Sequence, residues 1–367
     1  MDKPIRVLQM TASLYHGGSQ NMIINLYKAI DRNKVQFDFI IDHPELIDLK
    51  PVVESLGAKV YAMPTFKGAN IAEVKKAWNN FFNEHPEYKI IHSHSRSYAS
   101  IYLKIARQHG LKTIIHSHNT SNGSGIKSKI KDLLQLNLRN TADYFFSCSL
   151  DSGKWLFGDK IVNSDKFHII NNSIDATKFA YNEEIRKKYR NELSIENNIV
   201  YIQVGEFIEQ KNHIFTIELF RQLINKQPNA KLLLVGTGEY LENIKQLAND
   251  YNLYENIIFL GKRDDVNNLL QAADCYLMPS NYEGLSLAAI EAQASGIKCL
   301  LSDKCSKDVN ITNSIEFLPL DTNKWLEACT DTDCVRKDRS KEIINMGYDV
   351  NTTAKWLQDF YLDIINK

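Results

Sequence analysis

One strand–loop–helix unit shows how the chain folds. It reads CYLMPSNYEGLSLAAIEA from residue 275 to residue 292. Its first four residues form a continuous apolar run, which is typical of a parallel strand that is covered on both faces. Gly284 marks a turn after the strand, and residues 287–294 are apolar enough to form a helix that packs in a core. The unit therefore predicts a parallel α/β sheet.

The same alternation of apolar runs and helical patterns fills the rest of the chain. It predicts two doubly wound α/β domains, because strand–helix–strand units repeat in both halves. We place the first domain at residues 1–172 and the second at 173–349, with the boundary in a polar, turn-rich stretch. A last amphipathic helix is expected over residues 353–365 within a terminal segment 350–367, with Trp356, Phe360 and Ile364 on one stripe. The expected strands are residues 5–10, 37–41, 58–61, 90–92, 113–116, 144–148, 167–170, 199–204, 231–235, 256–260, 275–278, 298–301 and 315–318.

The overall composition excludes several classes of protein. Its 44 Lys and Arg residues balance 44 Asp and Glu residues in a chain of 367, which argues against a disordered chain and a histone-like nucleic-acid binder. No apolar run approaches the ~20 residues that cross a bilayer, and the first residues lack the apolar core of a signal peptide. The cysteines contain no Cys-x-x-Cys pair, which argues against a zinc ribbon and for reduced, mostly buried thiols in a cytosolic protein. They are Cys148, Cys275, Cys299, Cys305, Cys329 and Cys334.

Basic residues are concentrated between positions 89 and 140. This stretch contains nine Lys and Arg residues and one acidic residue, Asp132. It is either a solvated basic face or a surface that meets an anionic partner, such as phospholipid headgroups or a phosphate-bearing acceptor. Four of the basic residues flank leucines and isoleucines at helical spacing, which predicts an amphipathic helix that binds a membrane or, alternatively, packs in the core. They are Lys127, Lys129, Lys131 and Arg139.

Three loops are candidate ligand sites, because open α/β sheets bind ligands at the carboxyl ends of their strands. Gly17 and Gly18 follow the first strand and open a helix, where free amides favour phosphate, although two adjacent glycines also form plain turns. Lys211 follows the strand at 199–204 and can neutralise a diphosphate, although it can equally be a surface lysine. Glu206 lies in the same loop and would oppose an anion.

The third loop carries two carboxylates eight positions apart. Glu283 precedes the predicted helix, and Glu291 lies in its second turn and leans back toward the helix start. Both can face one pocket, where the amides at Leu285 and Ser286 would also point. Carboxylates accept hydrogen bonds from sugar hydroxyls, and a helix start accepts phosphate. The alternative is an ordinary acidic helix start, which explains Glu283 but not a carboxylate within an apolar run.

Residues 283–291 resemble the E-x7-E signature of glycosyltransferase family 4, whose members are retaining, nucleotide-sugar-dependent enzymes of the GT-B fold. Other segments agree with the family in order and spacing along nearly the whole chain. They are Gly17-Gly18, Asn172-Ser173-Ile174-Asp175, Lys211-Asn212-His213 and Leu260-Gly261-Lys262-Arg263. The run His116-Ser117-His118-Asn119 is most similar to the capsule and exopolysaccharide branch. The resemblance implies two Rossmann-like domains that face a central cleft, an acceptor-side first domain, a nucleotide-sugar-binding second domain, and a terminal helix that crosses back to the first.

The resemblance also implies roles for individual residues. Glu291 would hold the ribose hydroxyls, Glu283 the hydroxyls of the donor sugar, and main chain near Arg263 would flank the base. His118 would lie beside the transferred sugar, and His92 and His94 are competing candidates. The diphosphate would be bound by Lys211 and by main chain in the glycine-containing loops at Gly17, Gly18, Gly205, Gly284, Leu285 and Ser286.

The family implies a hexosyl- or N-acetylhexosaminyltransferase that takes a sugar from a nucleotide donor, UDP by preference, to a polyprenyl-diphosphate-linked acceptor. It would work at the inner face of the plasma membrane without a metal or other cofactor, and no metal-ligating histidine cluster is expected. Glu206 stands where the family usually has an arginine. This departure keeps open a catalytically impaired partner subunit, and a sugar-nucleotide epimerase of the same fold is a further alternative.

Overall fold

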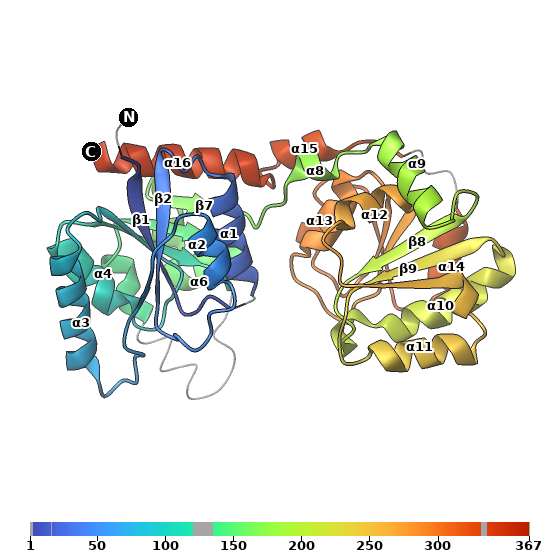
Figure 1. The fold of residues 1–367 in the computed structure, drawn as a ribbon, viewed down its shortest axis with the longest axis horizontal. Coiled ribbons are helices and arrows are strands. Elements are labelled where there is room, and N and C mark those ends of the chain that lie inside the picture. The colour runs from blue at the N-terminus through green and yellow to red at the C-terminus, as the bar shows by residue number, and fades with distance from the viewer. Residues whose placement is uncertain (1–2, 16, 120–134, 332–335, 367) are drawn as a thin grey trace. The chain divides into compact units, whose positions relative to one another are not determined.

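The computed structural model describes residues 3–15, 17–119, 135–331 and 336–366 (Figure 1). The chain forms two compact units. Unit 1 comprises residues 1–173 and 350–367, and unit 2 comprises residues 174–349. The division falls one residue after the boundary expected from the sequence. The terminal segment belongs to unit 1, so the chain leaves this unit once and returns to it.

Unit 1 contains a seven-stranded parallel sheet in the order β3-β2-β1-β4-β5-β6-β7 (Figure 1). All seven strands expected in this half are present, with ends shifted by at most two residues. The strands are β1 (Ile5–Thr11), β2 (Val35–Ile41), β3 (Val60–Ala62), β4 (Ile90–Ser93), β5 (Lys112–Ser117), β6 (Tyr144–Ser147) and β7 (Phe167–Ile169).

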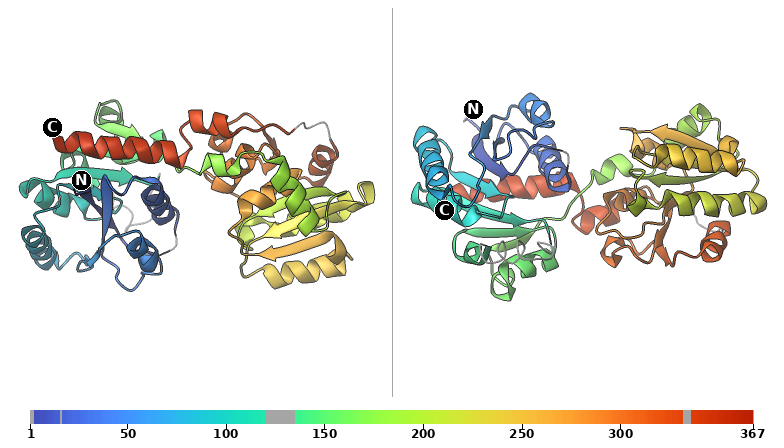
Figure 2. Two further views of the ribbon diagram at one scale, coloured as in Figure 1. Left: turned by 45° about the horizontal axis from the view of Figure 1, so that its top comes forward. Right: turned by 90° about the horizontal axis from the view of Figure 1, so that it is seen from below.

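Helices cover both faces of this sheet, which explains its continuous apolar strands. One face packs against α1 (Gly18–Ala29), α2 (Lys50–Ser55) and α16 (Val350–Asn366), and α16 contacts α1 (Figure 2). The other packs against α3 (Ile71–Glu84), α4 (Ala99–Gln108) and α6 (Leu150–Phe157), where Trp78 is fully buried. Among the described residues of this unit, the remaining short helices are η1 (Leu136–Asn140) and α7 (Asp159–Val162).

The buried stripe of α16 differs from the expected one. Ala354, Leu357, Tyr361 and Ile364 are buried, whereas Trp356 is 40% exposed. The expectation placed Trp356 in the core because it is aromatic and four positions from Phe360. Its ring instead stacks on Phe360 and contacts His168 at the edge of the sheet.

Unit 2 repeats the architecture with a six-stranded parallel sheet in the order β10-β9-β8-β11-β12-β13 (Figure 1). The six expected strands are again present. They are β8 (Ile199–Val204), β9 (Ala230–Val235), β10 (Ile257–Gly261), β11 (Cys275–Met278), β12 (Lys298–Ser302) and β13 (Ile315–Leu318). The helices are α8 (Ala176–Phe179), α9 (Glu183–Glu192), η2 (Glu209–Lys211), α10 (His213–Lys226), α11 (Leu241–Asp250), η3 (Tyr254–Asn256), α12 (Val266–Ala272), α13 (Leu287–Ala294), η4 (Lys307–Val309), α14 (Thr322–Thr330) and α15 (Ser340–Asn345).

Each sheet reverses its strand order at one point. In unit 1 the reversal lies between β1 and β4, and in unit 2 between β8 and β11. Loops that leave such neighbours diverge to opposite faces and leave a crevice at the carboxyl ends, where α/β proteins bind ligands. The Gly17-Gly18 loop follows β1, the Lys211 loop follows β8, and the Glu283 loop follows β11. The sheet order therefore places all three candidate loops at switch points.

Candidate active site

Hydrogen bonds join the two loops at the switch point of unit 2. Asn281 donates its backbone N–H to the carbonyl of Gln210 (2.8 Å), and Gln210 returns its side-chain amide to the carbonyl of Tyr282 (3.1 Å). Asn212 donates from its side chain to the Pro279 carbonyl (3.1 Å). Asn212 has a φ of 52°, a left-handed conformation that asparagine tolerates, and its side chain caps α10. These bonds hold the loop of Lys211 against the loop of Glu283.

Lys211 and Glu283 form an ion pair across this junction. Their side chains are 20% and 16% exposed, so the pair is largely withdrawn from water but reachable. The methylenes of Lys211 lie over Gly205, where an added Cβ would come within 3.4 Å of them. The lysine stem therefore packs directly on the backbone at Gly205. This contact could not be predicted from the sequence, because 72 residues separate the two charges.

Glu291 occupies the second turn of α13, as expected. Ser286 caps this helix by accepting from the Ala289 N–H (3.4 Å), and the first amides of a helix have no partner within it. Burial raises the pKa of the Glu291 carboxyl to about 7, although the positive charge of Lys178 lowers it. Gly284, in the turn before the helix, has open space where a Cβ would stand. A carboxylate, a lysine and helix-start amides can thus bind a sugar nucleotide on this unit.

Glu206 and Arg263 lie in the same unit without contacting each other. Arg263 is engaged by both carboxylate oxygens of Asp265 at 2.7 and 2.6 Å. An ion pair between Glu206 and Arg263 would have neutralised the unfavourable acid, and the structure does not form it. Glu206 is exposed, and no ion pair of its side chain lies within the described residues.

The glycine loop of unit 1 opens α1. The helix begins at Gly18, and Gly17 is its N-cap without a side-chain bond. An added Cβ at Gly17 would lie 2.7 Å from the Gln20 side-chain oxygen, whereas Gly18 has open space. The first amides of α1 therefore lie next to an uncrowded position that a ligand can approach.

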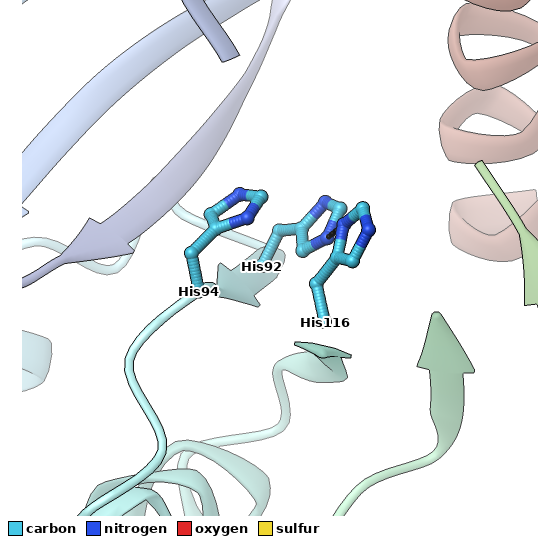
Figure 3. A group of neighbouring side chains, drawn as sticks. All are labelled: His92, His94 and His116. Carbon is cyan, nitrogen blue, oxygen red and sulfur yellow. Dashed lines mark hydrogen bonds between the residues drawn. The ribbon is translucent and has the colours of Figure 1, made fainter. Parts of the chain in front are cut away.

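Four histidines gather at the switch point of unit 1. His92 and His116 lie near the ends of β4 and β5, and His94 and His118 come directly after these strands. Figure 3 shows the rings of His92, His94 and His116 side by side. One nitrogen of each of these three lies within 4.8 Å of the others, as metal ligands would. The expectation that no such cluster exists was wrong, because alternate residues on adjacent parallel strands share a face.

Burial keeps these histidines uncharged. It lowers the pKa of His118 to about 3, with the positive charge of Arg96 adding to the effect, and it holds the pKa values of His92, His94 and His116 well below the usual range. Asn119 lies between His118 and Arg96: with its amide turned so that the nitrogen faces the protein acceptor, it donates to the His118 carbonyl (2.9 Å) and accepts from the Arg96 guanidinium (3.1 Å). The site around His118 is therefore neutral at the imidazole and cationic beside it.

Two further residues of this cluster were not expected from the sequence. Gln9 in β1 is 1% exposed, and its side chain contacts both His94 and Tyr361 of α16. A buried polar residue inside an apolar strand was the signal that could have revealed Gln9. No local signal could have revealed Tyr361, because 269 positions separate it from its partner His92.

The basic segment is only partly described. Lys127, Lys129 and Lys131 lie outside the described residues, so the predicted helix is not tested. Arg139 is exposed and donates to the Leu156 carbonyl (3.4 Å), whereas Leu138 is fully buried. Over the described part of the chain, each helix is too short or too polar to span a bilayer.

Comparisons with known proteins assign the family. A profile described as "Glycosyltransferase Family 4" matches residues 16–178, and one described as "Glycosyl transferases group 1" matches residues 185–319. "Putative glycosyltransferase EpsF" of Bacillus subtilis is 30% identical over 83% of this chain and 81% of its own length. An Escherichia coli UDP-Gal:alpha-D-GlcNAc-diphosphoundecaprenol alpha-1,3-galactosyltransferase is 26% identical over 77% of each chain.

Solved structures agree on the fold. The crystal structure of Anabaena Alr3699/HepE in complex with UDP superposes with a TM-score of 0.76 over 98% of this chain and 100% of that one, at 15% identity. The two parallel sheets, the returning terminal helix and the matched profiles lead to one conclusion. The chain belongs to glycosyltransferase family 4 and is a glycosyltransferase of the GT-B fold.

Proposed function

We propose that this glycosyltransferase moves a hexose or N-acetylhexosamine from a UDP-sugar to a glycan carried on polyprenyl diphosphate, with retention at the anomeric carbon. The observation that carries the proposal is the Lys211–Glu283 pair at the switch point of unit 2, with Glu291 on the adjoining helix. The E. coli relative, whose name includes a UDP-sugar and a diphosphoundecaprenol acceptor, supports the choice of donor and acceptor classes. The resemblance to the capsule and exopolysaccharide branch supports a role in the synthesis of such a polymer.

Lys211 would stabilise the leaving diphosphate. An ammonium group has three donors, so it can bind a phosphate oxygen while it keeps one bond to Glu283. The amides at Leu285 and Ser286 would add neutral donors, as would those at Gly18. Because negative charge grows on the leaving group as the glycosidic bond breaks, donors that are already in place lower the barrier. We propose that the transfer needs no metal ion, since these groups supply the charge stabilisation.

Glu283 and Glu291 would bind hydroxyl groups. Both are acceptors when ionised, Glu283 toward the donor sugar and Glu291 toward the ribose. Glu283 is not proposed as a nucleophile, because its carboxylate is engaged in the ion pair with Lys211. His118 would lie against the transferred sugar.

Calorimetry with UDP, UMP, GDP and a panel of UDP-sugars tests the donor site. UDP is expected to bind about tenfold or more tightly than UMP, which corresponds to ~1.4 kcal/mol for the second phosphate. Equal binding of UDP and UMP would contradict a diphosphate site. Turnover of the bound UDP-sugar to a free epimer, without transfer to a lipid-linked acceptor, would favour the epimerase.

The exposed Glu206 supports a second candidate, a binding partner that stabilises another transferase. Glu206→Arg restores the residue that the family usually carries in the Lys211 loop. If wild type fails to bind UDP and Glu206→Arg binds it, the partner-protein hypothesis replaces the enzyme hypothesis. A variant that changes UDP affinity less than about threefold, beside a wild type that binds, would exclude this candidate.

Membrane binding through Lys127, Lys129, Lys131 and Arg139 remains part of the proposal. Vesicles containing anionic phospholipid should co-sediment the protein at low salt and release it as salt rises, because surface charges are screened. Substitution of the three lysines by glutamine should abolish the binding, and substitution of Lys75 and Lys76 in α3 should not. Binding that does not depend on salt would contradict the proposed surface.

A further inference from the structure

Gln9 joins two chains of hydrogen-bonded histidines in unit 1. Its carbonyl oxygen lies 3.0 Å from Nε2 of His94, and its amide nitrogen lies 3.3 Å from the hydroxyl of Tyr361. It is 1% exposed, and its β1 position pairs with His92 in β4. One amide group therefore contacts both chains, with an acceptor toward one and a donor toward the other.

The first chain runs from Gln9 through His94 to His118. A carbonyl oxygen can only accept, so Nε2 of His94 carries the proton that bonds to Gln9. His94 is neutral, which leaves a lone pair on its Nδ1. This Nδ1 lies 2.8 Å from Nε2 of His118, so His118 must donate through Nε2. Because His118 is also neutral, its Nδ1 carries a lone pair, and this buried atom has no hydrogen-bond partner among the described residues.

The second chain ends with the opposite polarity. Tyr361 accepts from Gln9, and its hydroxyl, which has one proton to give, lies 2.6 Å from Nδ1 of His92. When that proton is donated to His92, Nδ1 of His92 is the acceptor. The remaining proton of His92 is on Nε2, which lies 3.3 Å from Nδ1 of His116. His116 then carries its own proton on Nε2, a second buried atom that lacks a partner within the described part of the chain. The orientation of one amide thus decides an acceptor at His118, and with Tyr361 donating to His92 the second chain ends in a donor at His116.

The two hydrogen-bonded chains explain how the histidines are arranged better than a bound metal ion does. Both ring nitrogens of His92 and both of His94 already take part in hydrogen bonds. A metal bound by His92, His94 and His116 would displace at least two of these bonds. The hydrogen-bonded chains need only the residues that are present.

We infer that Gln9 and His94 are positioning residues that fix His118 in the tautomer protonated on Nε2, so that its Nδ1 accepts a hydrogen bond from a hydroxyl group of the transferred sugar. The inference rests on the proposed function, because it takes His118 as the residue beside that sugar. It adds a requirement on the substrate: the sugar must carry a hydrogen-bond donor at this position. Fluorine can accept a hydrogen bond but cannot donate one, and it is repelled by the lone pair of Nδ1. A UDP-sugar with fluorine at this position should therefore react as slowly as one that lacks the hydroxyl group.

Nitrogen NMR of the full chain with 15N-labelled histidine tests the tautomer without any substrate. The His118 signals, assigned with His118→Gln, are expected to show a protonated Nε2 and an unprotonated Nδ1. A protonated Nδ1 would overturn the inference. Gln9→Leu should move the His94 and His118 signals, and Gln36→Leu, which removes a side-chain amide bonded to Tyr27 in the same unit, should leave them unchanged. His94 and His118 signals that are unchanged in Gln9→Leu would also overturn the inference. If Gln9→Leu does not fold, the wild-type spectrum alone decides which tautomer His118 adopts.

Donor analogues test the consequence for the reaction. Deoxy and deoxyfluoro UDP-sugars are compared position by position for kcat with a lipid-diphosphate-linked acceptor. We expect one sugar position at which the deoxy and the deoxyfluoro analogue lower kcat equally. Gln9→Leu should lower kcat about tenfold with the unmodified UDP-sugar, while it changes the affinity for UDP less than twofold. Retention of rate by the fluoro analogue at each sensitive position would refute an accepting His118. Absence of transfer by wild type would refute the proposed function but leave the tautomer measurement standing, so the two failures are distinguishable.

Discussion

The raised pKa of Glu291 predicts that donor binding depends on pH. A ribose hydroxyl donates to a carboxylate, and a protonated Glu291 would present an O–H donor in place of one acceptor, so the ionised form binds the ribose hydroxyls better. With a pKa of about 7, roughly one molecule in eleven is ionised at pH 6 and ten in eleven at pH 8. The affinity for a UDP-sugar should therefore rise about tenfold over this range, because the charged fraction rises about tenfold.

Calorimetry with UDP-glucose measures this dependence well, because both phosphates of a sugar nucleotide are esterified and do not titrate in this range. Glu291→Gln is the matched variant, since it keeps the shape of the side chain and removes the titration. Its affinity should be lower than that of wild type at pH 8 and flat between pH 6 and pH 8. A wild type with a flat profile, or a variant that keeps the slope, would refute the assignment of Glu291 to the ribose.

Stability gives an independent check of the same carboxyl. A folded-state pKa above the ordinary value of 4.5 means that the folded protein binds the proton more tightly than the unfolded chain does. The resulting stability is fully present below pH 4.5 and is lost as the pH rises through about 7. The melting temperature of wild type relative to Glu291→Gln should thus fall between pH 5 and pH 8. A constant difference would show that the carboxyl is not buried in solution.

Three further predictions follow from particular contacts. Lys211→Met should lower turnover about a hundredfold or more and remove the preference for UDP over UMP, while Lys211→Arg keeps part of both, as measured by product formation and calorimetry. Gly236→Ala should destabilise unit 2 by roughly 3 kcal/mol or more, because its φ of 145° is strained for alanine and the added Cβ would lie 1.9 Å from the Gly205 carbonyl oxygen. Gly284→Ala, where space is open, should change the free energy of unfolding by no more than about 0.5 kcal/mol. Urea titration of both glycine variants measures this difference. Trp78→Ala should cost about 3–5 kcal/mol in unit 1, whereas alanine at the 40% exposed Trp356 should cost clearly less; equal losses would contradict the buried stack of Trp78 on Tyr102.

The positions of the strands and of helices such as α13 followed from the sequence, for a local reason. Continuous runs such as that of β11 (Cys275–Met278) are buried on both faces, and the start of α13 is marked by Gly284 and the capping Ser286. Short polar helices such as α2 (Lys50–Ser55) gave too weak a periodicity to be expected. The roles expected of Glu283, Glu291 and Lys211 came from their resemblance to the family, since spacing along the chain does not by itself bring charges together.

Only the tertiary structure decided which of these residues meet. Lys211 contacts Glu283 because β8 and β11 are neighbours at the switch point of the sheet, and Arg263 turns to Asp265 rather than to Glu206. The histidine chains depend on Gln9, on two strands in parallel register and on Tyr361 from the returning helix. Apolar periodicity is a property of neighbouring residues and can be read from the chain. Hydrogen bonds between residues hundreds of positions apart depend on sheet order and register, which the fold as a whole determines.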